Sequence, residues 1–103
     1  MLRKRRFADV IRRQLDLFVR DHLELLDACD AAERSYDRAE RAVAEERFGN
    51  YQDLVETGTE ILADLRDNFA STLDEASAEE YEDEFNRAVT KRLPRFGLEI
   101  ENR

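Results

Sequence analysis

The stretch from Phe7 to Phe48 contains neither glycine nor proline, the two residues that most often interrupt a helix. Apolar residues recur along it at spacings of three and four, which is the period of one helical face. The sequence therefore predicts a single helix over about residues 4–47. At about 1.5 Å per residue such a helix would be about 66 Å long. Because a domain of this size is about half as wide, a compact ball could not bury it.

The apolar residues of this stretch follow a heptad repeat with two seam positions. Its first half carries further apolar residues beside the seam, so we expect that half to meet more than one neighbouring helix. Its second half is narrower and rich in alanine, which allows another backbone to come close. The seam is thus predicted to lie in a core or an interface. One seam position holds Ala8, Leu15, His22, Cys29, Tyr36 and Val43, and the other holds Ile11, Phe18, Leu25, Ala32 and Ala39.

The residues after this stretch predict a return path made of shorter helices. Gly49 suits the position after a helix end, and Asn50 suits the cap of a new helix. A second helix is therefore expected over about residues 51–73. Ser77 and Glu80 then form a capping-box pattern, which indicates that a third helix begins close to Ser77.

This third helix is predicted over about residues 77–93, where Pro94 ends it. One continuous helix over 51–92 is the alternative. Either arrangement matches the length of the first helix, so the predicted fold is all-α, an elongated antiparallel helical hairpin in one domain, residues 1–94. Residues 95–103 are expected to form an extended tail, because apolar and polar residues alternate there. The apolar members of the alternation are Phe96, Leu98 and Ile100.

A two-layer hairpin buries only one stripe of each helix and leaves the wide stripe of the first helix partly in water. Two hairpins packed side by side would form a four-helix bundle with a continuous core. We therefore expect a homodimer in which the seam contributes to the interface or core. The seam residues assigned this role are Ile11, Leu15, Phe18, His22, Leu25, Cys29, Tyr36 and Val43.

Charge is distributed unevenly along the chain. The net charge is −8, yet the first 20 residues carry seven basic and two acidic side chains, and residues 74–84 carry seven acidic and no basic ones. Residues 3–20 read as a basic amphipathic helix that could contact nucleic acid or an anionic membrane. Asp9 and Asp16 interrupt it, and the acidic remainder repels phosphates, which makes both contacts less favoured than protein recognition. The predicted basic patch comprises Arg3, Lys4, Arg5, Arg6, Arg12 and Arg13.

His22 and Cys29 are the weak candidates for a metal site. They lie seven residues apart on one seam, about 10 Å along a helix, so they could share a zinc ion only if a second chain supplied partners. A buried histidine and a cysteine that acts as a small apolar residue are the simpler interpretation. The Glu-x-x-His pattern of ferritin-like di-iron bundles is missing, and no motif for catalysis or a cofactor stands out.

The sequence thus predicts a protein-interaction or scaffold module that acts as a helical-bundle homodimer without a cofactor or catalytic activity. The alternatives are a ferritin-like metal-binding bundle and an adaptor that uses its basic N-terminus. The single cysteine excludes a disulfide within one chain, and no apolar run approaches the roughly 18 residues of a membrane span. A cytoplasmic location is the expectation that fits these features.

Overall fold

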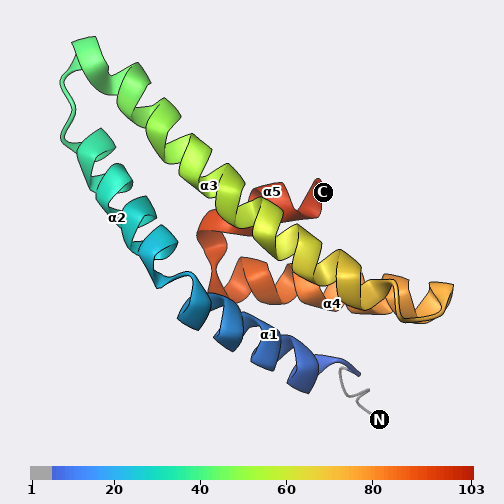
Figure 1. Cartoon of the computed structure of the whole chain (residues 1–103). Helices are drawn as coiled ribbons and strands as arrows, with labels where there is room; N and C mark the ends of the chain where they lie inside the picture. Colours follow the sequence, from blue (N-terminus) through green and yellow to red (C-terminus); the bar gives the residue numbers. More distant parts are fainter. Residues whose placement is uncertain (1–5) are drawn as a thin grey trace.

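In the computed structural model the described residues, 6–103, form helices and no strands, as the predicted all-α class requires (Figure 1). The α-helices are connected by short turns, and a 3₁₀ helix, η1, precedes the last of them. The elements are α1 (Ala8–Asp21), α2 (Leu23–Asp37), α3 (Arg41–Ala70), α4 (Glu75–Arg92), η1 (Pro94–Phe96) and α5 (Gly97–Glu101).

The prediction of one helix over residues 4–47 is wrong within the described part of the chain. His22, with φ −124° and ψ 33°, separates α1 from α2. The bend interrupts little backbone bonding, because the His22 N–H donates to the Phe18 carbonyl and the His22 carbonyl accepts from Leu26, both at 3.0 Å. A bend at this point allows α1 to lie on α4 while α2 runs along α3. The continuous apolar stripe of the sequence therefore packs against two different helices.

The chain reverses direction at residues 38–40 and not at Gly49 and Asn50, which lie inside α3. The turn is closed by two hydrogen bonds, from Ala39 N–H to the Tyr36 carbonyl and from Val43 N–H to the Glu40 carbonyl. The early reversal aligns α2 with the first half of α3 and brings the rings of Tyr36 and Phe48 together. Packing between the two helices therefore outweighs the local stop signal.

The predicted break between the second and third helices is confirmed, which excludes the continuous helix over 51–92. Helix α4 nevertheless begins at Glu75, two residues before the predicted cap Ser77. Asp74 is the N-cap, and its carboxylate accepts hydrogen bonds from the backbone N–H and the hydroxyl of Ser77, which lower the pKa of Asp74. The helix ends at Arg92, before Pro94, as expected.

The expected extended tail over 95–103 is wrong, because η1 and α5 are helical. Phe96 is 1% exposed and Ile100 is fully buried, whereas Leu98 is 79% exposed. Residues 96 and 100 are four apart and share one helical face, so a helix buries both and leaves Leu98 in solvent.

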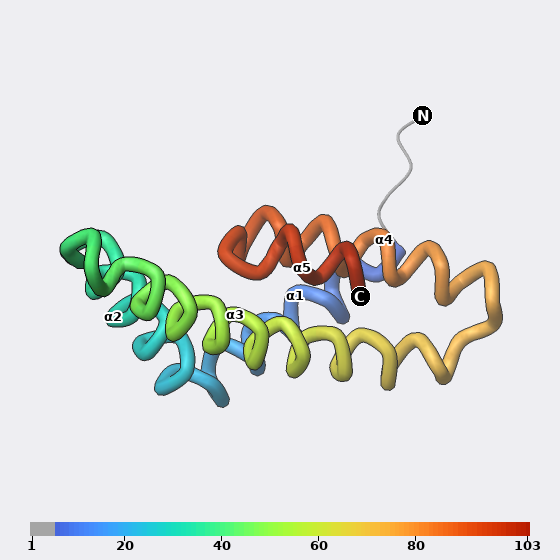
Figure 2. Tube along the Cα trace, turned by 90° about the horizontal axis from the view of Figure 1, so that it is seen from above, coloured from blue at the N-terminus to red at the C-terminus, as the bar shows by residue number. Residues whose placement is uncertain are grey.

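The structure is elongated, with extents of 53 × 28 × 24 Å and a radius of gyration of 15.8 Å, against about 13 Å for a compact domain of this length. Its narrow end consists of α2 and residues 41–54 of α3, which we call the arm (Figures 1 and 2). The remaining helices surround the main core. The buried apolar side chains are Phe7, Ile11, Leu15, Phe18, Cys29, Val55, Leu62, Ala63, Ala70, Tyr81, Phe85, Val89, Phe96 and Ile100.

Gly58 and Gly49 of α3 should respond oppositely to replacement by alanine. A Cβ at Gly58 would lie 2.5 Å from Cε1 of the buried Phe96 ring, whereas a Cβ at Gly49 would meet nothing within 4 Å. Overpacking costs about 1–3 kcal/mol, which exceeds the gain of about 1 kcal/mol in helix propensity. We expect Gly58→Ala to destabilise the protein and Gly49→Ala to stabilise it in urea titrations followed by circular dichroism. Stabilisation by both changes would show that Phe96 is free to shift.

Candidate functional site

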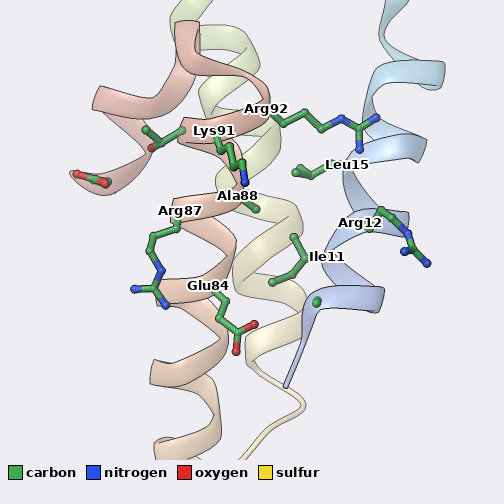
Figure 3. A pocket seen from close by; sticks show the side chains of 11 residues that line it. Ile11, Arg12, Leu15, Glu84, Arg87, Ala88, Lys91 and Arg92 are labelled. Carbon is green, nitrogen blue, oxygen red and sulfur yellow. The ribbon is translucent and has the colours of Figure 1, made fainter. Parts of the chain in front are cut away.

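A groove of about 740 Å³ lies between α1 and α4 (Figure 3). Ile11 and Leu15 extend from α1 toward α4 and form its bottom, where both are almost completely buried. The small side chains of Ala8 and Ala88 line the more accessible part. Two helices diverging over an apolar floor leave a concave surface with space for another chain element. The other lining residues are Arg12, Glu84, Arg87, Thr90, Lys91, Arg92 and Glu101.

Four cationic side chains surround this floor, of which two are held by carboxylates of α1. Arg92 reaches across the groove, with its Nη2 2.6 Å from Oδ1 of Asp16, and Arg12 lies 3.5 Å from Asp9. Within residues 6–103, Arg87 and Lys91 have no ion-pair or hydrogen-bonding partner. The groove therefore offers two exposed cations, Arg87 and Lys91, that form no ion pair with the rest of the described chain.

Three of the seven acidic residues in segment 74–84 make contacts that hold parts of the described chain together. Asp74 caps α4, and the buried carboxylate of Glu84 accepts a hydrogen bond from the Phe7 backbone N–H at 3.3 Å. Glu80 lies 3.7 Å from the guanidinium of Arg6. Because α4 places these acids beside the start of α1, the acidic segment holds that start on the main core.

The predicted basic patch is divided by the structure. Arg3, Lys4 and Arg5 lie outside the described residues. Arg6 turns toward α4, where it donates to the Ser77 hydroxyl at 2.9 Å and lies 5.0 Å from the centre of the Phe7 ring. Arg12 lines the groove, and Arg13 is exposed on α1. The described members therefore do not form one surface.

The two metal candidates are packed in different ways. The ring of His22 lies 5.1 Å from that of Phe18, at the bend between α1 and α2. Cys29 is fully buried on α2, and this burial raises the pKa of its thiol. In the described part of the chain, no group of three or more histidine, cysteine or carboxylate side chains is arranged to hold a metal ion. A site shared by these two residues would still need ligands from a second chain.

The remaining seam residues divide by their position along the molecule. Ile11, Leu15 and Phe18 are buried together with Cys29 in the main core, where Phe18 contacts Phe96 of the same chain at 6.1 Å between ring centres. The other four seam residues assigned to the core or interface are more exposed. His22, Leu25 and Val43 are partly buried, and Tyr36 is 39% exposed.

The arm carries a second candidate surface, formed by two exposed aromatic rings. The rings of Tyr36 and Phe48 lie 5.3 Å apart, and Phe48 is 45% exposed. At the base of the arm, the Arg95 guanidinium binds Asp30 at 2.9 Å and Glu33 at 2.8 Å and contacts the Tyr51 hydroxyl at 3.2 Å. This cluster attaches the arm to η1, so the arm is anchored at one end only.

Sequence reasoning identified Arg12 but missed the other three cations of the groove. The signal was present, because residues 85–95 contain four basic residues and no acidic one, directly after the acidic segment 74–84. Their arrangement around a concave floor depends on how α1 crosses α4, which is a tertiary property. The cationic residues missed are Arg87, Lys91 and Arg92.

Comparisons with protein-family models, with curated proteins and with solved structures found no match to this chain. Among the described helices, none combines the length and the apolar character required to cross a bilayer.

Proposed function

We propose that this chain is a protein-interaction module without catalytic activity that works as a homodimer, with the arm as the dimer interface. In the proposed dimer, the arms of two copies pack side by side, so that α2 and the first half of α3 from each copy form a four-helix bundle. The observation that supports it best is the exposed ring pair of Tyr36 and Phe48 on an arm only two helices thick.

The reason for self-association differs from the one suggested by the sequence. The seam residues of α1 are covered inside the chain, since Ile11, Leu15 and Phe18 are buried against α4 and η1, and of the wider stripe Leu17 stays 41% exposed. The arm instead lacks a third layer (Figure 1). Two helices without further cover are marginal on their own in water, because their stability depends on packing of the apolar face. A second arm would supply that packing and remove both rings from solvent.

The proposal predicts that the chain elutes with about twice its 12.1 kDa mass when light scattering is measured on a sizing column at micromolar concentration. The double variant Tyr36→Ser, Phe48→Ser should weaken the dimer by at least about tenfold, because aromatic side chains dominate most interfaces. Circular dichroism would verify that the helices remain.

Leu17→Ser is the matched control, because Leu17 is exposed to a similar degree, 41%, but lies on α1 outside the arm. It should leave the mass unchanged. A folded wild-type monomer at this concentration would contradict the proposal. A dimer that Leu17→Ser dissociates while the arm variant does not would move the interface away from the arm.

A further inference from the structure

We infer that the α1–α4 groove is a docking site for an acidic amphipathic helix of a partner protein. This inference does not depend on the dimer, because the groove and the arm are separate surfaces of the molecule. It rests on the shape of the groove, on its apolar floor and on the position of its cations.

The dimensions of the groove suit about two turns of helix. Its walls run from Ala8 to Leu15 on α1 and from Glu84 to Arg92 on α4, about 10–12 Å each at 1.5 Å per residue. Ala8 and Ala88 are small, so they leave room above the buried Ile11 and Leu15. An incoming helix could place apolar side chains at spacings of three and four on this floor, which is the usual mode of helix-in-groove recognition.

The charge of the groove selects an acidic ligand. The chain has a net charge of −8, yet the groove is bordered by four cations. Arg87 and Lys91 are four residues apart on one side of α4 and have no partner within residues 6–103, so they can bind carboxylates without losing an existing ion pair. Arg12 stands on the α1 side of the floor. Opposite charge across such an interface increases both the association rate and the specificity.

The same surroundings disfavour a phosphate backbone or a membrane as the ligand. Glu84 and Glu101 also line the groove, and Glu79, Glu82 and Asp83 continue along α4 beyond its cationic half. A polyanion that followed α4 would meet these carboxylates within one or two turns. A bilayer surface is flat on this scale and would not enter a concave floor. A short helix that places its carboxylates beside Arg87 and Lys91 ends before it reaches Glu79, Glu82 and Asp83.

The test measures the fluorescence anisotropy of a labelled synthetic helix of about 14 residues, with leucine on one face and glutamate elsewhere. This peptide should bind at low salt and weaken as salt screens the charges. The variant Arg87→Glu, Lys91→Glu should reduce its affinity by at least about tenfold. Ala88→Phe, which fills the floor without changing charge, should also reduce it.

Arg13→Glu, Arg20→Glu is the matched control, because it changes the net charge equally but lies at exposed positions of α1 outside both the groove lining and the arm. Equal weakening by this control, or equal binding of a scrambled peptide with its leucines spread around the helix, would overturn the inference. Tighter binding of single-stranded DNA or of phosphatidylglycerol vesicles, lost in the groove variant, would assign the groove to phosphates instead. A dimer that does not bind the peptide overturns only this inference, and a monomer that binds it overturns only the proposed function.

Discussion

Replacing Phe96 with alanine is expected to lower the free energy of unfolding by about 3–5 kcal/mol, the usual cost of truncating a fully buried aromatic side chain. Phe96 is 1% exposed and packs edge-on against Phe18 of α1. Its ring also fills the space beside Gly58 of α3. The side chain thus joins three elements that are distant in sequence, and its loss would leave a cavity where they meet. Urea titrations followed by circular dichroism would measure the change.

Leu98 provides the control from the same segment. It lies two residues from Phe96 and is 79% exposed, so Leu98→Ala should change stability by no more than about 0.5 kcal/mol. Similar losses for both variants would indicate general sensitivity of the C-terminal segment and not a specific core position. A small loss for Phe96→Ala would contradict the described packing of η1 on α1 and α3.

The contrast between Phe96 and Leu98 explains why the sequence misled about this segment. Apolar residues at 96, 98 and 100 satisfy the alternation of a strand, while 96 and 100 alone satisfy the spacing of a helix. A segment of nine residues contains too few positions to separate the two patterns. The choice is made by the cavity that α1, α3 and α4 leave, which accepts Phe96 and Ile100 on one helical face.

The helical class and most helical residues were predictable, because the period of three and four holds through α1, α2 and α3. The ends of the helices were predictable only where a backbone restriction sets them, as at Pro94. Helix α3 passes through Gly49 because glycine in a helix costs only about 1 kcal/mol. The packing of α2 on α3 stabilises the fold by more than that cost. No residue type at positions 38–40 indicates from the sequence that the chain reverses there.

The groove between α1 and α4 was also predictable only in part. Its apolar floor follows from the predicted seam, since Ile11 and Leu15 were expected to be buried. Its cationic border does not, because Arg12 and Arg87 are 75 positions apart and become neighbours only when α1 crosses α4. The bend at His22 makes that crossing possible, and the heptad pattern continues through His22 without a change of phase. Because the same heptad pattern packs first on α4 and then on α3, the pattern alone does not indicate the residue at which the neighbouring helix changes.

Arg66 is the buried charged side chain on which the C-terminal segment depends. It is 4% exposed on α3, and its Nη1 donates to the Asn86 side chain at 2.9 Å and to the Ile100 carbonyl at 3.1 Å. Its Nε donates to Asp67 at 2.8 Å. One guanidinium therefore links α3, α4 and α5, and at the end of α5 it shares the Ile100 carbonyl with the Arg103 backbone N–H, which donates to it at 3.3 Å.

Replacing Arg66 with methionine is expected to cost about 2–4 kcal/mol, because the Asn86 side chain and the Ile100 carbonyl would each lose a hydrogen bond from a guanidinium that is only 4% exposed. Arg66→Lys should recover only part of this, since a single ammonium cannot reproduce the fork that contacts three groups. Arg13→Ala, which removes an exposed arginine from α1, should change stability by no more than about 0.5 kcal/mol in the same urea titrations. Full recovery with lysine would mean that charge alone stabilises the site, whereas partial recovery would show that the geometry of the guanidinium holds α5 on the core.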